Sequence, residues 1–192
     1  MEGAIPPILF LGGHGSTHAA RAAVEQSLRT ALPNGVEVFS VGGPVGLAAG
    51  ASAWWSDEPE ADGWPALVAL LDSTADSLGL AARSIVVVGF SQGGAAALAW
   101  ASTPGRRQTL AAVVCVAGFL PGSTVPVASG GSPPVVVVIP EDDELVDPFL
   151  GGVAVRALSK AGFLVTRLDV AGGHEWTPTI ASAVARWLAK LH

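Results

Sequence analysis

The sequence predicts an α/β fold: a three-layer sandwich in which helices cover both faces of a mainly parallel sheet of about six strands. Short β-branched, apolar runs alternate with Ala- and Leu-rich stretches of helical length along the 192 residues. The apolar runs also lack a period of two, which is typical of strands buried on both faces. Since no linker divides the chain, one domain over residues 1–192 is expected.

The expected strands are the short apolar runs at residues 8–11, 36–40, 85–88, 111–116, 135–139 and 163–168. The expected helices are the Ala- and Leu-rich stretches at residues 17–31, 65–78, 92–102, 152–160 and 178–191. The first helix ends at the turn sequence Pro33-Asn34-Gly35. The last begins after Thr177, a typical N-cap residue, with Pro178 at its first position. Segment 42–62 is irregular and long enough to line a site.

Composition and charge exclude several classes of function. The net charge is −6 and no run of Lys or Arg occurs, so a nucleic-acid partner is not expected. No stretch reaches the roughly 20 apolar residues that span a bilayer. The N-terminal apolar run lacks the basic residues of a signal peptide, so a cytoplasmic location is expected.

No cofactor or metal is expected either, because no spacing of His, Cys and carboxylates is typical of a metal site. The chain has one cysteine, Cys115, and therefore no disulfide within the chain. Cys115 lies in an apolar run and is interpreted as a buried strand residue, with a reactive thiol as the alternative.

Ser91 lies in Gly89-Phe90-Ser91-Gln92-Gly93, between an expected strand and an expected helix. A G-x-S-x-G sequence at such a junction predicts a sharp turn from which the serine hydroxyl projects at the carboxyl edge of the sheet. The glycines let the strand and the helix approach closely. This pattern predicts Ser91 as a nucleophile; the alternative is a tight turn without chemistry.

A serine nucleophile needs a base, which follows both the serine and the acid in the chain order of this kind of turn. His14 and His18 precede Ser91, and His192 ends the chain. His174 follows the last strand and precedes the last helix, in a glycine-rich loop that can reach over the sheet edge. His174 is therefore predicted as the base.

The acid is expected in the loop at 140–148, after the strand at 135–139. This loop contains five carboxylates. Asp147 precedes Pro148 and is interpreted as a helix N-cap. Glu141 and Glu144 are interpreted as solvated, which leaves Asp142 and Asp143 as candidates.

Two backbone N–H groups are expected to stabilise the oxyanion of a tetrahedral intermediate. One belongs to Gln92, directly after the nucleophile, and the other to His14, in the glycine-rich loop after the first strand. This loop matches neither a P-loop, since no Lys follows its glycines, nor a dinucleotide fingerprint, since a third glycine is missing.

Together these motifs resemble the α/β-hydrolase superfamily, and within it the phospholipase/carboxylesterase branch that includes acyl-protein thioesterases and small bacterial carboxylesterases. The resemblance covers nearly the whole chain. Residues 89–94 resemble the G-F-S-Q-G-G elbow of that branch, and residues 173–175 its G-H-x stretch. Residues 143–146 resemble its D-x-x-V pattern, which favours Asp143 over Asp142. Residues 11–15 resemble its L-H-G-x-G loop, with Gly12 where the family usually has His.

The resemblance implies an α/β-hydrolase fold, here without a lid domain and without the usual first two antiparallel strands. Residues 50–55 resemble a loop that ends in an aromatic pair near the acyl site. The candidates for an apolar substrate pocket are Trp54, Trp55, Leu47, Phe119 and Val146. For each of them the alternative is ordinary packing.

The sequence thus predicts a serine hydrolase that cleaves carboxylic esters or thioesters through an acyl-enzyme intermediate. Its expected partner is a small-molecule substrate, and a monomer or homodimer is expected. Two alternatives remain open: an acyltransferase or perhydrolase with the same triad, and a non-catalytic, ligand-binding member of the fold.

Overall fold

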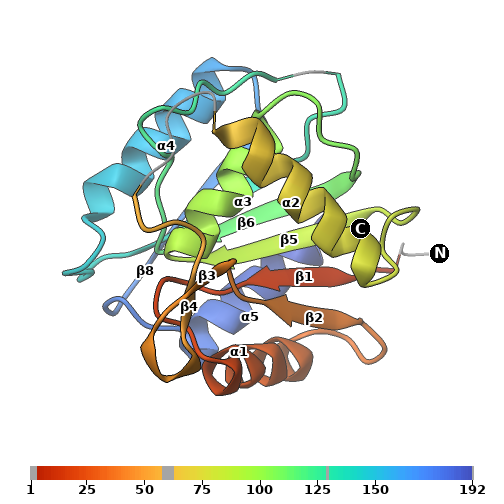
Figure 1. Cartoon of the computed structure of the whole chain (residues 1–192). Helices are drawn as coiled ribbons and strands as arrows, with labels where there is room; N and C mark the ends of the chain where they lie inside the picture. The colour runs from red at the N-terminus through yellow and green to blue at the C-terminus, as the bar shows by residue number, and fades with distance from the viewer. Residues whose placement is uncertain (1–3, 58–62, 129, 192) are drawn as a thin grey trace.

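The computed structural model describes residues 4–57, 63–128 and 130–191. Its main sheet has six strands in the order β2-β1-β5-β6-β7-β8, and all neighbours in it pair in parallel (Figure 1). This confirms the predicted α/β class and the number of strands. The strands are β1 (Ile8–Leu11), β2 (Val38–Val41), β5 (Ile85–Phe90), β6 (Leu110–Val116), β7 (Val135–Pro140) and β8 (Val165–Val170).

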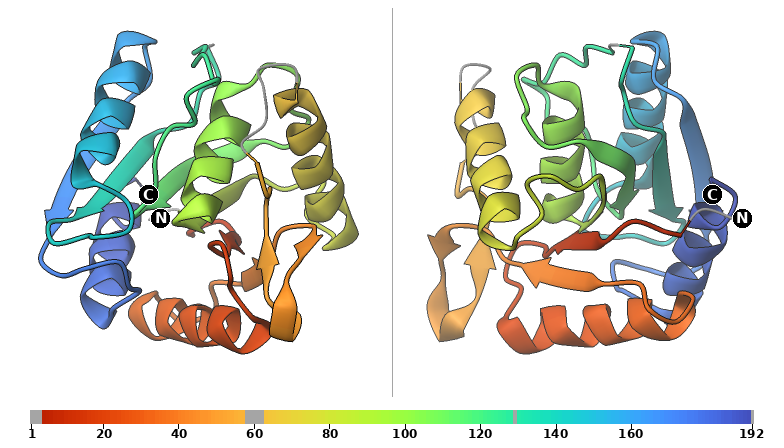
Figure 2. Two further views of the ribbon diagram at one scale, coloured as in Figure 1. Left: turned by 60° about the vertical axis from the view of Figure 1, so that its left-hand side comes forward. Right: turned by 90° about the vertical axis from the view of Figure 1, so that its right-hand side faces the viewer.

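Helices cover both faces of the sheet and complete the three layers (Figure 2). They are α1 (His18–Ala31), α2 (Trp64–Ser77), α3 (Gln92–Ser102), α4 (Pro148–Lys160) and α5 (Pro178–Leu188). Helices α1 and α5 lie on one face, and α2, α3 and α4 lie on the other. The carboxyl ends of all six strands consequently meet at one edge of the sheet, where loops from both layers converge.

Alternate residues of each central strand enter two separate hydrophobic clusters. In β1, Leu9 and Leu11 join the cluster under α2, α3 and α4. Ile8 and Phe10 join the cluster under α1 and α5. Because both faces are buried, both sets must be apolar, and the strand sequence carries no alternation.

The predicted start of α4 at residue 152 is wrong, because the helix begins one turn earlier, at Pro148. Asp147 caps it, as expected, by accepting a hydrogen bond from the Phe149 backbone N–H. Two glycines made this turn look unfavourable for a helix. Gly151 is needed there for packing, since a Cβ on it would lie 2.8 Å from the Ile139 side chain.

The last strand was also expected too early, at 163–168. It runs to Val170 and lies at the edge of the sheet, where none of its residues is fully buried and Arg167 and Asp169 are exposed. Its outward-facing Arg167 and Asp169 pair with each other. An edge strand needs only one apolar face, which explains the polar residues in this run.

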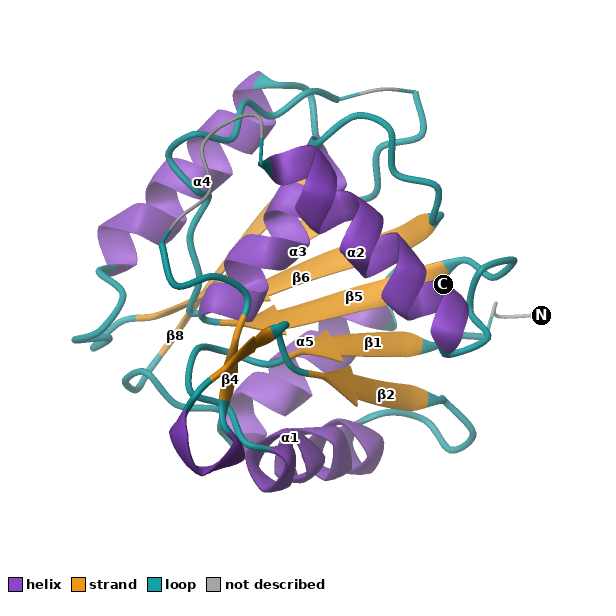
Figure 3. Ribbon diagram, viewed as in Figure 1, coloured by secondary structure: helices purple, strands orange, loops and turns teal. Residues whose placement is uncertain are grey.

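The irregular segment 42–62 contains a short antiparallel hairpin of β3 (Val45–Gly46) and β4 (Ser52–Ala53). Figure 3 shows this hairpin standing beside the carboxyl ends of the central strands. Residues 58–62 lie outside the described part of the chain. In the described ranges no lid is evident, and none of the helices is long and apolar enough to cross a bilayer.

Candidate active site

Ser91 forms the turn between β5 and α3 and has a strained backbone, with φ 55° and ψ −122°. Positive φ is rare for a residue with a side chain and tends to occur at functional positions. The flanking glycines make the turn possible. A Cβ on Gly89 would lie 2.1 Å from the Gly93 carbonyl oxygen, and one on Gly93 would lie 2.2 Å from that of Leu11. The G-x-S-x-G spacing is therefore a steric requirement of this turn.

The structure brings Ser91, His174 and Asp143 into one hydrogen-bonded series. Nε2 of His174 lies 2.9 Å from Oγ of Ser91. Nδ1 of the same ring lies 2.7 Å from Oδ2 of Asp143. The Asp143 side chain is only 1% exposed and that of His174 is 12% exposed, so water competes little for this hydrogen bond. A neutral imidazole in this setting donates from Nδ1 to the carboxylate and accepts at Nε2 from the serine hydroxyl.

Asp143 is fixed from its other side by backbone donors. Its Oδ1 accepts hydrogen bonds from the N–H groups of Leu145, at 2.9 Å, and Val146, at 2.8 Å. Oδ2 is thereby left for the histidine. The D-x-x-V spacing thus places this carboxylate just before a turn whose N–H groups, at Leu145 and Val146, point back at it.

The competing carboxylates lie elsewhere. Asp142 is exposed, and its backbone N–H donates to the Gly172 carbonyl. Asp147 caps α4, and Asp169 pairs with Arg167. Of the two candidates left open by the loop sequence, Asp143 is the one in contact with His174.

The glycine-rich loop after β1 lies directly beside Ser91, since a Cβ on Gly13 would come within 3.1 Å of the Ser91 Cβ. The backbone N–H groups of Gly12, Gly15 and Ser16 donate to carbonyl oxygens of Val41, Ser52 and Gly13. Within the described residues, the N–H of His14 has no such acceptor.

Gln92 is the first residue of α3, where backbone N–H groups have no acceptor inside the helix. His14 and Gln92 thus lie in the two segments next to Ser91, and their backbone N–H groups are the candidates for the oxyanion donors expected from the sequence.

The side chain of Gln92 makes contacts that the sequence did not predict. Its side-chain carbonyl accepts from the Trp54 backbone N–H at 2.8 Å, and its amide NH2 donates to the Trp55 carbonyl at 2.9 Å. The indole N–H of Trp54 in turn donates to the Gly12 carbonyl at 2.9 Å. These bonds join the start of α3, the hairpin segment and the glycine-rich loop.

The five candidates for the substrate pocket are placed as follows. Trp54 and Trp55 are 4% and 8% exposed and belong to the core under α2, α3 and α4. Phe119 packs against the same cluster, and Leu47 is half-buried in the hairpin. Val146 is half-buried and lines a small cavity beside Asp143. The two indoles therefore lie in the hydrophobic core next to the site.

Arg21 of α1 is another residue that the sequence reasoning missed. Its guanidinium donates to the Ser16 carbonyl at 3.0 Å and lies 3.4 Å from the hydroxyls of both Ser16 and Ser52. Its aliphatic stem fills the space beside Gly12, where an added Cβ would meet Cδ of Arg21 at 2.8 Å. Arg21 thus connects the glycine-rich loop to the β3–β4 hairpin at the position where a larger residue 12 would stand.

Cys115 lies in β6 and is fully buried, and this burial raises the pKa of its thiol to about 12. The thiolate is consequently negligible near neutral pH, and the packing interpretation of this residue is the one the structure supports. Among the described residues, no group of three or more His, Cys, Asp or Glu side chains could hold a metal ion.

Comparisons with known proteins agree with this architecture. The model of the phospholipase/carboxylesterase family matches residues 4–192. No curated protein matches the sequence. The solved structures similar to it include a Bacillus cereus carboxylesterase, with a TM-score of 0.79 and 20% identity over 98% of this chain and 89% of that one.

Two plant structures are also similar. Arabidopsis thaliana SOBER1 has a TM-score of 0.76 and 20% identity, over 98% of this chain and 99% of that one. Zea mays acyl-protein thioesterase 2 has a TM-score of 0.73 and 23% identity, over 99% and 95%. These likenesses show a shared α/β-hydrolase fold.

Proposed function

Because the chain belongs to the phospholipase/carboxylesterase family, we propose that it is a serine hydrolase that cleaves carboxylic esters or thioesters through an acyl-enzyme intermediate. Ser91 is the nucleophile, His174 the general base and acid, and Asp143 the residue that orients His174. The hydrolase class is supported by the family and by the carboxylesterase and acyl-protein thioesterase folds that it resembles. The assignment of roles is supported by the geometry of the site.

In the first half of the reaction, the Ser91 Oγ–H proton passes to Nε2 of His174 while Oγ forms a bond to the acyl carbon. The resulting imidazolium is stabilised by Asp143. His174 then gives the proton to the departing oxygen or sulfur as the bond from the acyl carbon to that atom breaks. The products of this half are the acyl-enzyme and the free alcohol or thiol.

In the second half, water attacks the acyl carbon and transfers a proton to Nε2 of His174. The bond to Oγ of Ser91 breaks, Ser91 recovers its proton, and the carboxylic acid leaves. In both halves the carbonyl oxygen carries a transient negative charge. The backbone N–H groups of His14 and Gln92 are assigned to hold this oxygen, a contribution worth roughly 3–4 kcal/mol per donor in comparable sites.

A single observation carries the proposal: the contacts of 2.9 Å and 2.7 Å that the two nitrogens of one imidazole make with Ser91 and Asp143. A buried carboxylate and a strained serine backbone both cost folding free energy. Such a cost is typical of groups that act together in catalysis. A purely ligand-binding protein has no need of this arrangement.

Labelling with a fluorophosphonate probe tests the proposal. We expect the wild-type protein to be labelled at Ser91 and to hydrolyse short p-nitrophenyl esters, and Ser91→Ala to do neither. Ser159→Ala, an exposed serine in α4, is the matched control and should behave as the wild type. Wild-type protein that neither labels nor hydrolyses any ester would favour the non-catalytic alternative.

Product analysis in the presence of competing alcohols or peroxide separates hydrolysis from acyl transfer and perhydrolysis, which use the same triad. Hydrolysis predicts that the free acid remains the main product. The cytoplasmic location and the monomeric or homodimeric state stay predictions. Cell fractionation checks the location, and light scattering after gel filtration checks the oligomeric state.

A further inference from the structure

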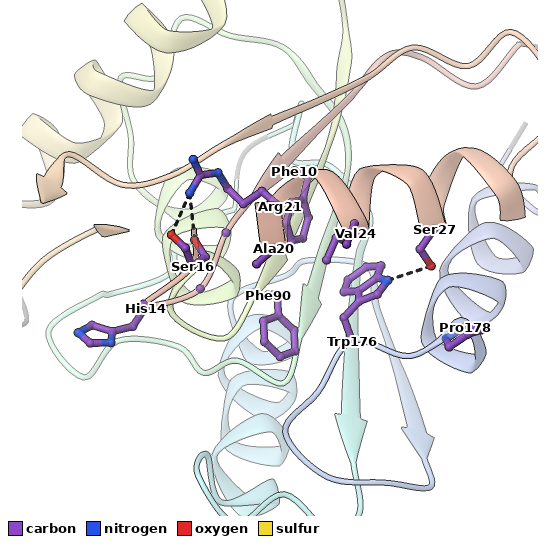
Figure 4. A pocket seen from close by; sticks show the side chains of 14 residues that line it. Phe10, His14, Ser16, Ala20, Arg21, Val24, Ser27, Phe90, Trp176 and Pro178 are labelled. Carbon is purple, nitrogen blue, oxygen red and sulfur yellow. Dashed lines mark hydrogen bonds between the residues drawn. The ribbon is translucent and has the colours of Figure 1, made fainter. Parts of the chain in front are cut away.

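A cavity of about 560 Å³ lies between α1 and the loop that leads into α5. Phe10 of β1 and Phe90 of β5 form its floor, Ala20 and Val24 of α1 one wall, and Trp176 the other (Figure 4). Its size falls within the roughly 300–1,000 Å³ of pockets that hold small ligands. It lies on the face of the sheet opposite the cluster that contains Trp54 and Trp55.

The apolar lining of this cavity is continuous with the proposed catalytic base. The Phe90 ring lies 5.0 Å from the His174 ring, measured between centroids. Trp176, two residues after His174, lies 6.3 Å from Phe90 and 5.5 Å from Phe10 in edge-to-face contacts. The Trp176 indole N–H donates to the Ser27 hydroxyl of α1 at 3.4 Å, which fixes the wall to the helix.

The glycine-rich loop borders the same cavity through Gly12, Gly13, His14 and Gly15. The His14 imidazole points away from Phe90 and Trp176 in Figure 4, so this side chain leaves the apolar space open. A group that occupies the cavity would therefore lie beside both His174 and the loop assigned to the oxyanion.

We propose that this cavity binds the apolar alcohol or thiol part of the substrate, the group that leaves in the first half of the reaction. This inference rests on the function proposed above. The departing oxygen or sulfur must lie within hydrogen-bond reach of Nε2 of His174 to receive its proton. The carbon chain on that atom then extends past His174, and Phe90 and Trp176 are the apolar side chains that contact or follow this histidine.

The polar groups of the cavity favour a neutral occupant. Arg21 lines it, but its guanidinium is bonded to Ser16, and the Ser27 hydroxyl is bonded to Trp176. No carboxylate occurs among the described residues that line it. The expected substrates are therefore esters or thioesters whose leaving group carries an uncharged alkyl or aryl chain.

Filling the cavity from α1 tests the inference. Ala20 is exposed and lines the cavity, so Ala20→Trp adds bulk there without replacing a buried residue. Ala22→Trp, on the same helix but outside the lining, is the matched control. Ala23→Trp, at a second exposed lining position, serves as an independent filling variant.

Three substrates separate the leaving group from the acyl group: methyl acetate, hexyl acetate and methyl hexanoate. Methanol and hexanol differ little as leaving groups except in apolar bulk. Since each buried methylene contributes about fourfold to binding, Ala20→Trp should lower kcat/KM for hexyl acetate at least about tenfold. The values for methyl acetate and methyl hexanoate should stay within about twofold of the wild type.

Two results would overturn the inference while leaving the proposed function intact. In the first, both filling variants retain wild-type activity on hexyl acetate. In the second, the loss follows the acyl chain and appears with methyl hexanoate, which would assign the cavity to the acid part. Wild-type protein without fluorophosphonate labelling or ester turnover would instead overturn the proposed function, and the leaving-group inference with it.

Discussion

The indole N–H of Trp54 donates a hydrogen bond to the backbone carbonyl of Gly12, 2.9 Å away, and both residues are buried. This contact ties the segment after the β3–β4 hairpin to the loop that carries the proposed oxyanion donor. Trp54 is only 4% exposed, and this bond gives its polar indole N–H a partner in the core.

Trp54→Phe keeps an aromatic side chain but removes the indole N–H donor. The Gly12 carbonyl would then be buried without this partner, at a cost of about 1–3 kcal/mol in the free energy of unfolding. We expect a lower kcat as well, because the loop loses a fixed point. Trp187→Phe removes an indole donor to Thr166 far from the loop, and should change stability without changing kcat. Equal kcat values for both variants, measured alongside urea denaturation, would contradict this role.

Arg21→Ala should lower kcat roughly tenfold on a short ester, with little change in KM. The expected cause is a displaced oxyanion loop, since loss of one oxyanion donor costs more than this. Arg21→Lys keeps the charge but loses the planar donor group, and should recover only part of the activity. Steady-state kinetics on methyl acetate avoids the cavity that Arg21 also lines. An unchanged kcat in both variants would show that the loop keeps its position without Arg21.

Asp143→Asn should lower kcat roughly a thousandfold or more, because the amide no longer stabilises the imidazolium or holds its tautomer. Asp142→Asn changes an exposed neighbour whose backbone N–H bond to Gly172 remains, and its kcat should match that of the wild type. Stopped or steady-state assays on the two variants compare the two candidates directly. A larger loss in Asp142→Asn would reverse the assignment.

Asp72→Asn should destabilise the fold by about 2–4 kcal/mol. The Asp72 carboxylate is 2% exposed and accepts hydrogen bonds from the Trp100 indole and from the backbone N–H groups of Arg107 and Gln108. Both carboxylate oxygens accept hydrogen bonds, so the NH2 group of an asparagine would face an N–H donor in place of an acceptor. Asp76→Asn, which breaks an exposed pair with Arg107, should cost less than about 1 kcal/mol. Urea denaturation measures both, and similar losses would contradict the burial argument.

Burial raises the pKa of the Cys115 thiol from 9.0 to about 12, so the folded protein should resist thiol reagents at pH 8 and react only after unfolding. The raised pKa also affects stability. The stability of the folded protein is unaffected by this thiol below pH 9.0. It falls as the pH rises from 9.0 towards 12, because the thiol of the unfolded chain ionises in this range while the buried thiol does not. Cys115→Ser should remove this alkaline loss. Rapid labelling of the native protein would contradict the buried state.

The sequence predicted the class of fold and most elements because apolar periodicity and turn residues are local signals. Ser91 and His174 were predicted as nucleophile and base from similar signals, glycine spacing and order along the chain, and the structure brings their side chains into contact. The roles of Arg21 and the Gln92 side chain could not be predicted. Both act through contacts with the hairpin segment, and only the folded chain reveals which carbonyls and hydroxyls lie within their reach. Gly151 misled the prediction of α4, since its packing against Ile139 is not visible in a helix pattern.

The parallel pairing of β1 with β5 has a kinetic consequence. Leu11 pairs in register with Gly89, although α1, β2, the β3–β4 hairpin and α2 lie between these strands in the chain. Such distant pairing closes a long loop and is a slow step in refolding. The loop after β1 and the turn at Ser91 come together only when this pairing is complete. Recovery of ester turnover after dilution from denaturant would therefore lag behind recovery of helix content. The rate of this recovery would report the rate at which β1 pairs with β5.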